Sequence, residues 1–199
     1  MLEFIETTHT YLLDKEVVPS VTQLLKPLQD LSGIPPHVLA KACEFGINVH
    51  KAVHLYLLDE LDMDALYPAL IPPLDAFRRW QDKEGVEFFL NEWPRIEQPL
   101  AHTKLCYAGT PDLDFLYGPT IDIKTRPFNS LTDPIQLEAY GELSKFNGGA
   151  NGDKFVLQLA PDGEYTFTPA NDKRSKSRFR YLLDFYYATK TINSWRNDT

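Results

Sequence analysis

Residues 107–125 read YAGTPDLDFLYGPTIDIKT, and they place two acidic positions on either side of a turn rich in glycine and proline. Strand-like residues precede and follow the turn, so the segment predicts a β-hairpin. Adjacent strands bring Asp112 and Asp122 side by side, where repulsion between the carboxylates would raise the pKa of one of them unless a cation neutralised both. A hard divalent cation is the economical occupant, because such ions prefer oxygen ligands.

Asp122 and Lys124 flank Ile123, so on a strand the two charged side chains share one face and Ile123 points to the other. The Asp-x-Lys spacing therefore presents an anion and a cation together. The backbone carbonyl of Ile123 is a candidate additional ligand for the cation. Asp114, two residues beyond Asp112 on the same strand face, is a rival carboxylate ligand.

Turn residues and apolar spacing extend the pattern along the whole chain. On the N-terminal side they predict a hairpin over residues 4–13, a helix over 20–25 with Ser20 as its N-cap, and helices over 37–60 and 74–84, the last ended by Gly85. Strands are predicted over residues 86–90, 95–100, 104–108, 113–117 and 120–123. A helix over 132–146, strands over 154–159 and 165–168 and a final helix over 175–195 complete the pattern. This order indicates a single domain of the α/β or α+β class over residues 1–199.

The composition is that of a globular chain, since 43% of the 199 residues are hydrophobic and 24% are charged. There are 20 basic and 28 acidic residues, which gives a formal net charge of -8. This balance argues against a protein whose main task is to coat nucleic acid, because that affinity comes from neutralising phosphates with Lys and Arg. It leaves room for an enzyme that holds DNA briefly with a local basic strip.

No apolar run approaches the roughly 18 residues that cross a bilayer, and the N-terminus lacks a basic segment followed by an apolar core. We therefore expect an intracellular, cytoplasmic protein with no membrane partner. Cys43 and Cys106 are too few for a disulfide framework, a four-thiolate zinc site or an iron–sulfur cluster, and they are expected to be reduced and buried. No Gly-rich phosphate loop is present, so ATP is not an expected partner.

Four short motifs occur in order along the chain. They are Phe45-Gly46-Ile47-Asn48-Val49-His50, Gly109-Thr110-Pro111-Asp112, Asp122-Ile123-Lys124-Thr125, and the pair Gln136 and Tyr140. In these residues the chain resembles the PD-(D/E)XK nuclease superfamily, specifically its RecB-type branch, which includes phage exonucleases and exonucleases of the mitochondrial genome maintenance type. The segment Pro19-Ser20-Val21-Thr22 also looks like the N-terminal signature of this branch. Each motif alone is weak, but the ordered set spans residues 19–140 and is specific.

The resemblance implies an α/β fold with a restriction-endonuclease-like core, in which a mixed central β-sheet is flanked by helices and the N-terminal part is helical. It also implies a metal-dependent deoxyribonuclease. It implies that His50, Asp112 and Asp122 bind Mg²⁺ or Mn²⁺, which acidifies water and compensates the charge of the transition state. Lys124 is then expected to position or deprotonate the attacking water and to screen the phosphate. Because an imidazole ligand suits Mn²⁺ better than Mg²⁺, we expect Mn²⁺ to support activity at least as well as Mg²⁺.

For Glu97 and His50, the resemblance bears on the choice between a ligand role and an ordinary structural role. Glu97 matches a position where the branch often has an acidic residue, so it either helps to bind the metal or is an ordinary solvated strand carboxylate. His50 taken alone would be a structural histidine, and its motif favours the ligand role. His54, one helical turn later on the same face, is the comparison residue for mutagenesis.

Gln136 and Tyr140 lie one turn apart on the helix predicted over residues 132–146. The resemblance implies that the amide and the phenol contact DNA or hold Lys124 beside the metal. The alternative for Gln136 is a capping box with Asp133, three residues earlier. The alternative for Tyr140 is a place in the core.

A basic cluster begins the last predicted helix. It consists of Lys173, Arg174, Lys176, Arg178 and Arg180. Positive charge at this end opposes the helix macrodipole and costs about a few tenths of a kcal/mol per residue, which phosphate binding would explain. A solvated helix face is the alternative. Arg126 is a second candidate phosphate contact, and Phe128 and Tyr107 are candidates for base stacking, although burial is the more common role of such rings.

The leading interpretation is a DNA exonuclease that acts on DNA ends or single-stranded DNA, with the exonuclease preference carried by the resemblance alone. The alternatives are a site-specific or structure-specific endonuclease of the same fold, a catalytically inactive nucleic-acid-binding module, and a hydrolase of small phosphate esters. Intact Asp112, Asp122 and Lys124 argue against the inactive module, and a basic strip suits a polymer better than a small ester. Some phage relatives form rings, so a homo-oligomer is compatible with the resemblance.

Overall fold

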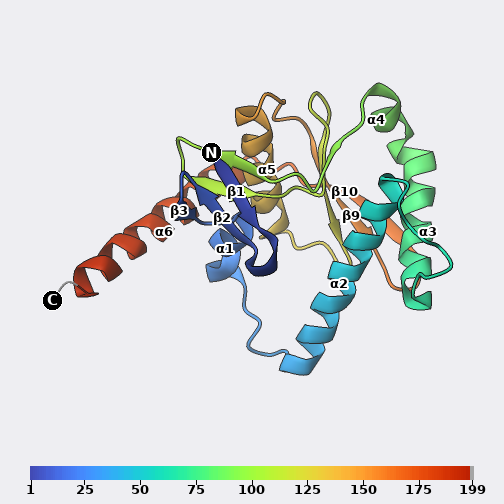
Figure 1. Ribbon diagram of the computed structural model, residues 1–199, viewed down its shortest axis with the longest axis horizontal. Coiled ribbons are helices and arrows are strands. Elements are labelled where there is room, and N and C mark those ends of the chain that lie inside the picture. Colours follow the sequence, from blue (N-terminus) through green and yellow to red (C-terminus); the bar gives the residue numbers. More distant parts are fainter. Residues whose placement is uncertain (198–199) are drawn as a thin grey trace.

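The computed structural model describes residues 1–197, with side chains described through Thr191. Its centre is a five-stranded mixed sheet in the order β10-β9-β8-β7-β4 (Figure 1). The strands are β4 (Arg95–Ile96), β7 (Leu113–Asp114), β8 (Thr120–Lys124), β9 (Lys154–Leu159) and β10 (Tyr165–Pro169). β8 and β9 run parallel, and the other neighbouring pairs are antiparallel. Helix α5 (Asp133–Phe146) makes the crossover that a parallel pair requires.

Two smaller sheets lie beside the central one. β1 (Leu2–Ile5), β2 (Thr10–Leu13) and β3 (Glu16–Val18) form an antiparallel sheet, and β5 (Leu100–His102) pairs with β6 (Tyr107–Gly109). A single bridge between Ser20 and Ala108 joins the end of the N-terminal sheet to β6. The sequence predicted β1 and β2 as a hairpin, and β3 extends that hairpin by one strand.

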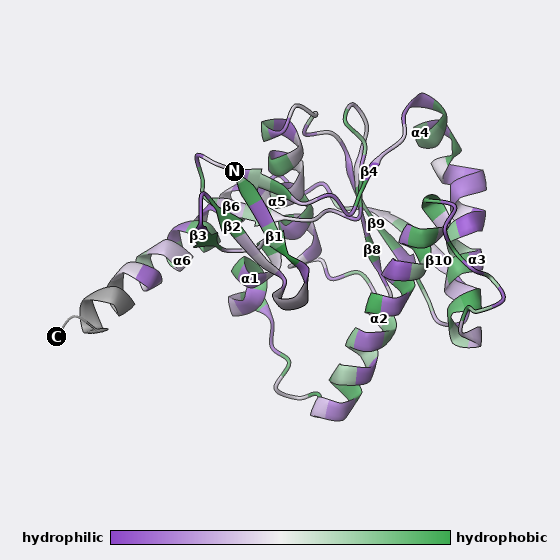
Figure 2. Ribbon diagram, in the orientation of Figure 1, coloured by the Kyte–Doolittle hydropathy of each residue, from purple (hydrophilic) through white to green (hydrophobic). Residues whose placement is uncertain are grey.

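Helices cover both faces of the central sheet. They are α1 (Val21–Leu25), α2 (Pro36–Leu57), α3 (Ile71–Trp80), α4 (Val86–Asn91) and α6 (Ser175–Asn197), with short 3₁₀ turns at Glu6–Thr8, Lys26–Leu28 and Pro68–Leu70. Leu157 of β9 belongs to the core cluster of α2 and α3, whereas its neighbour Val156 packs with Leu137 of α5. Since successive strand residues face opposite sides, α3 and α5 lie on opposite faces. Figure 2 shows that the side of α3 away from the sheet is hydrophilic.

The fold confirms the expected α/β class, with a mixed sheet flanked by helices. The N-cap prediction is also confirmed, because the Ser20 hydroxyl accepts the Gln23 amide N–H and the Gln23 side chain accepts the Ser20 amide N–H. Helix α5 begins at Asp133 with Pro134 in its first turn, but its N-cap Thr132 makes no side-chain capping bond.

The strand predicted over residues 86–90 is wrong, because this segment is α4. The helix expected to end at Gly85 instead continues through a π-helical turn, Gln81–Gly85. A Cβ at Gly85 would lie 3.2 Å from the Trp80 ring, so glycine lets the turn close over that ring. Helical geometry brings the consecutive residues Phe88 and Phe89 both against Phe115, with ring centroids 5.8 and 5.3 Å apart, which a strand cannot do on one face.

The strand predicted over residues 95–100 is divided into β4 and β5, and the strand predicted over residues 113–117 ends at Asp114. Cys43 and Cys106 are free, as expected, but both are exposed, which corrects the expectation of burial. Cys43 lies on the solvent-exposed first half of α2, and Cys106 lies in the turn before β6 with a φ of 53°. Within residues 1–197, no helix has the length and apolar character needed to span a membrane.

Candidate metal centre

Three acidic residues fall in one row across neighbouring strands. β4 pairs Ile96 with Leu113, and β7 pairs Leu113 with Ile121. The next position on each strand is acidic, namely Glu97, Asp112 and Asp122. The Glu97 amide N–H donates to the Asp112 carbonyl oxygen over 3.1 Å, so the row continues one step beyond the regular pairing. Strand register therefore confirms the proximity of Asp112 and Asp122 that the hairpin predicts.

Helix α2 adds two histidines to this row. His50 Nδ1 lies 3.1 Å from Asp112 Oδ1, and His54 Nδ1 lies 2.9 Å from Glu97 Oε2. The helix passes close to the end of β8, since a Cβ at Gly46 would lie 3.3 Å from Thr125 Oγ1. The glycine of the first motif thus permits the approach that brings the histidines to the sheet.

His50, Glu97 and Asp112 form the compact part of the site. One ligand atom from each lies within 4.8 Å of the others, a spacing suited to holding a metal ion. Glu97 has a φ of 44°, in the left-handed region that costs a residue with a side chain roughly 1–2 kcal/mol. Backbone strain at this residue separates β4 from β5 and turns its carboxylate to the histidines.

Asp112 is held on both carboxylate oxygens. Oδ1 faces His50, and Oδ2 accepts the Ile123 amide N–H over 2.5 Å. Burial by itself raises the pKa of Asp112, but the His50 imidazolium, the Lys124 ammonium and the Ile123 N–H together hold that pKa below its ordinary value. The N–H and C=O of one strand residue point to the same side, so the Ile123 carbonyl also lies on the Asp112 side of β8. That is the placement expected for a backbone ligand.

Asp122 lies beside the compact group, on the α5 face of the sheet. Its Oδ1 accepts an N–H from the Gln136 amide over 3.1 Å, and the same amide nitrogen donates to the Tyr140 hydroxyl over 3.2 Å. The capping-box interpretation of Gln136 is therefore wrong, because the Gln136 side chain is used by Asp122 and Tyr140. Lys124 Nζ lies 2.6 Å from Asp122 Oδ2, so the Asp-x-Lys pair is formed.

At both Asp122 and His50, burial and the oppositely charged neighbours shift the pKa in opposite directions. Burial raises the pKa of Asp122 to about 6, with a further rise from Asp112, although Lys124 and His50 act in the other direction. Burial lowers the pKa of His50, but Asp112 and more weakly Asp122 outweigh this effect and raise it to about 9. Without a metal, His50 is thus an imidazolium that balances the carboxylates at neutral pH.

The residues form a group that could hold a metal ion. Carboxylate oxygens and one imidazole nitrogen converge, and hard divalent ions take such ligands. Asp122 Oδ2 is buried and receives no well-directed hydrogen bond, although the Lys124 ammonium is in ion-pair contact with it. A buried carboxylate oxygen without a directed donor is costly unless a cation compensates it. Asp112, Glu97 and His50 would hold the ion, with Asp122 beside them.

A second layer of contacts fixes the segment that carries Asp112. The Tyr11 hydroxyl of β2 and Thr110 Oγ1 are 2.7 Å apart, and the Ala108 N–H donates to the Pro19 carbonyl over 3.0 Å. A Cβ at Gly109 would lie 2.8 Å from the Tyr140 ring, so glycine allows β6 to approach α5. Sequence reasoning missed Tyr11, for which no local signal exists.

Asp114, the predicted rival of Asp112, lies outside the group of converging ligand atoms and is paired with an arginine. Its carboxylate is buried and paired with Arg95, and its Oδ1 accepts from the Thr120 hydroxyl over 3.4 Å. Arg95 also donates to Ser144 of α5. Asp112 lies beyond the paired part of β7 and accepts from the β8 backbone, whereas Asp114 lies within the paired part and bonds to Arg95 of β4.

The structure does not bring the basic cluster to the metal centre. Lys176 and Arg180 pair with Glu142 of α5, and Arg178 pairs with Asp172. Arg126 binds both oxygens of the buried Asp133 and so fixes the start of α5. Within the described part of the chain, the side chains of Lys173 and Arg174 make no hydrogen bond or ion pair and are exposed.

The two candidate stacking rings are both used in packing. Tyr107 is fully buried and its hydroxyl donates to the Ala139 carbonyl over 3.0 Å, while Phe128 packs against Leu137 and Val156. The alternative of burial therefore applies to Tyr107, whereas Phe128 is partly buried.

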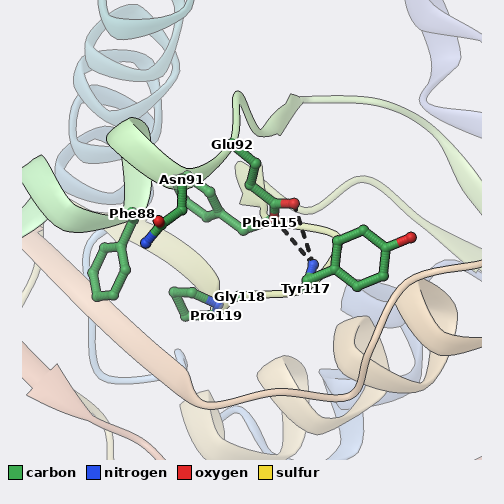
Figure 3. A pocket seen from close by; sticks show the side chains of 7 residues that line it. All are labelled: Phe88, Asn91, Glu92, Phe115, Tyr117, Gly118 and Pro119. Atoms are coloured by element: carbon green, nitrogen blue, oxygen red, sulfur yellow. Dashed lines mark hydrogen bonds between the residues drawn. The ribbon is translucent and has the colours of Figure 1, made fainter.

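A separate pocket of about 310 Å³ lies between α4 and the turn that joins β7 to β8 (Figure 3). Its lining residues are Phe88, Asn91, Glu92, Phe115, Tyr117, Gly118 and Pro119. The Glu92 carboxylate accepts a hydrogen bond from the Tyr117 amide N–H over 3.0 Å. None of the residues predicted for the metal centre lines this pocket, so the two are distinct.

Comparison with known proteins found no matching family model and no matching curated protein. The class of site therefore rests on the geometry itself: a centre of carboxylates and histidine, with a paired aspartate and lysine beside it, in a mixed α/β fold.

Proposed function

We propose that this protein is a metal-dependent deoxyribonuclease, an exonuclease that acts on DNA ends or single-stranded DNA. The observation that carries the proposal is the convergence of His50, Glu97 and Asp112 next to the Asp122–Lys124 pair. Phosphodiester hydrolysis requires an activated water and compensation of negative charge, and this set of groups suits both requirements.

The topology supports the proposal. β4, β7 and β8 form an antiparallel meander, and α5 then returns the chain to β9, parallel to β8. The Asp-x-Lys pair lies on β8 and the Gln136–Tyr140 pair lies on α5. This order of elements and motifs is the one expected for a restriction-endonuclease-like core, the finer fold class that we propose.

The residues of the centre have different roles in the proposed reaction. A bound divalent cation would supply Lewis acidity and lower the pKa of water. His50, Asp112 and Glu97 would hold that cation, and Gln136 orients Asp122 through its 3.1 Å hydrogen bond. The Lys124 ammonium, 17% exposed and 2.6 Å from Asp122 Oδ2, is placed to hold the attacking water or a phosphate oxygen.

The first test is nuclease activity on end-labelled single-stranded and double-stranded DNA with Mn²⁺ or Mg²⁺. Asp122→Asn and Lys124→Ala should each lower the rate by at least about two orders of magnitude, the scale of losing one electrostatic contact in a transition state. Asp64→Asn, at an exposed acidic position between α2 and α3, is the matched control and should cleave like the wild type. Wild-type rates in both site variants would refute the assignment.

The choice of cation tests His50 separately. Because imidazole is a comfortable ligand for Mn²⁺ and an uncommon one for Mg²⁺, the wild type should be at least as active with Mn²⁺. An enzyme active with Mg²⁺ alone would remove His50 from the ligand set. A covalently closed circular plasmid as substrate distinguishes the alternative endonuclease, which would cut it, from the exonuclease, which would not.

A further inference from the structure

Helix α2 places a second histidine at the edge of the metal centre. His54 lies one turn after His50 on the same face, and its Nδ1 is 2.9 Å from Glu97 Oε2. The His54 and Glu97 side chains are 29% and 32% exposed, so solvent reaches the pair but does not surround it. His54 does not belong to the compact group formed by His50, Glu97 and Asp112.

Glu97 needs a partner more than the other acidic residues of the centre do. Both Asp112 oxygens accept a hydrogen bond from the protein, and Asp122 is held by Gln136 and Lys124. Glu97 instead follows the last residue of β4, in a left-handed backbone conformation, with a longer and partly exposed side chain. Within the described part of the chain, His54 provides the only side-chain hydrogen bond or ion pair of the Glu97 carboxylate.

We propose that His54 is a positioning residue that holds the Glu97 carboxylate in the metal centre and so increases the affinity of the centre for a divalent cation. The proposal rests on the proposed function only in that the centre binds such an ion. One Glu97 oxygen accepts from the imidazole, which leaves the rest of the carboxylate to face His50 and Asp112. Hydrogen bonds of this kind orient metal ligands, and their loss typically weakens metal binding about 10–100-fold.

Mn²⁺ binding, measured without DNA by the electron paramagnetic resonance signal of the free ion, tests the proposal. His54→Ala should weaken binding by about 10-fold or more. His54→Asn should restore most of the affinity, because its amide nitrogen occupies nearly the place of Nδ1 and can donate to Glu97. His37→Ala, at an exposed histidine at the start of α2, should bind Mn²⁺ like the wild type.

A double mutant distinguishes positioning from a general effect on the fold. In a Glu97→Gln background the His54→Ala change should weaken Mn²⁺ binding little further, because the carboxylate that His54 positions is already gone. Unchanged Mn²⁺ affinity in His54→Ala, no recovery in His54→Asn, or full additivity with Glu97→Gln would each overturn the proposal. So would a wild type that binds no Mn²⁺.

This readout is independent of catalysis. If Mn²⁺ binding depends on His54 as expected and no DNA substrate is cleaved, the positioning role stands and the nuclease proposal fails. If DNA is cleaved and the Mn²⁺ affinity does not change in His54→Ala, the nuclease proposal stands and the positioning role of His54 fails.

Discussion

Asp122 is a buried carboxylate whose ionised form destabilises the metal-free fold. The residue is 2% exposed, and its Oδ2 has the Lys124 ammonium beside it but no well-directed hydrogen bond. Burial raises its pKa to about 6, so ionising Asp122 at neutral pH costs the metal-free protein free energy.

This leads to a prediction for Asp122→Asn in the presence of a chelator. The folded-state pKa exceeds the unfolded value, so the penalty is absent at low pH and grows as the pH rises from about 4 to 6. We therefore expect the variant to be more stable than the wild type at pH 7 by about 1–3 kcal/mol, and the difference to narrow toward pH 4. Urea denaturation at pH 7 and pH 4 measures the difference in the free energy of unfolding between the variant and the wild type. A variant less stable than the wild type at pH 7 would contradict the electrostatic account.

Sequence reasoning worked best for residues whose role depends on local spacing. The ion pair of Asp122 with Lys124 and the approach of His50 to Asp112 follow from alternation on a strand and from the motif on α2. Asp114 was misplaced because its partner, Arg95, comes from a different strand. No pattern along the chain encodes that pairing.

At the scale of elements, the contact of β6 with α5 and α1 determines where Tyr140 lies. A Cβ at Gly109 would meet the Tyr140 ring at 2.8 Å and Val21 Cγ2 at 2.9 Å. The same close approach carries Thr110 to Tyr11, two residues before Asp112. The packing of β6 against α5 and α1 therefore helps to determine the position of Asp112.

Gly109→Ala should destabilise the protein by about 1–3 kcal/mol, the cost of overpacking a closed contact. The displaced Tyr140 should also loosen the hydrogen bond between Gln136 and Asp122, so Mn²⁺ affinity should fall. Gly33→Ala is the matched control, because a Cβ at Gly33 meets nothing within 4 Å and should change stability by less than about 0.5 kcal/mol. Equal stabilities of the two variants in thermal denaturation would contradict this prediction. They would show that β6 can shift away from Tyr140 at no cost in stability.

The elements themselves were predictable to the extent that their residues act locally. Helix α5 follows from Pro134 in its first turn and from the turn residues after Phe146, and β8 follows from its alternation. Helix α4 was predicted as a strand because Val86, Phe88 and Leu90 alternate with other residues. Val86 and Leu90 are 38% and 79% exposed, so the alternation does not mark a buried strand face.

At the scale of the whole molecule, acidic residues outnumber basic ones, and most of the basic cluster at the start of α6 is paired with acidic side chains. The net charge is -8, and Lys176, Arg178 and Arg180 are each paired with an acidic side chain. Lys173 and Arg174 are the exposed members of the basic cluster that make no ion pair within the described residues. Any phosphate contact made by this cluster should therefore fall mainly on these two.

The double variant Lys173→Gln with Arg174→Gln should lower the salt dependence of DNA binding. Each phosphate contact contributes a slope of about 0.7 to 0.9 in log affinity against log salt, so the slope should decrease by up to about 1.4–1.8. Lys176→Gln, whose ammonium faces Glu142 at 2.9 Å, is the comparison and should have a smaller effect. An unchanged slope in the double variant would assign the cluster to a solvated helix face.

The exposed thiols at Cys43 and Cys106 have a practical consequence for handling and studying the protein. Cys43 lies on α2, seven positions before His50, and Cys106 lies in the turn between β5 and β6. Purification without a reductant would invite covalent cross-linking between molecules. The same two sulfurs also offer natural attachment points for a pair of fluorescent dyes, whose energy transfer would report any movement of α2 when an oligonucleotide is added.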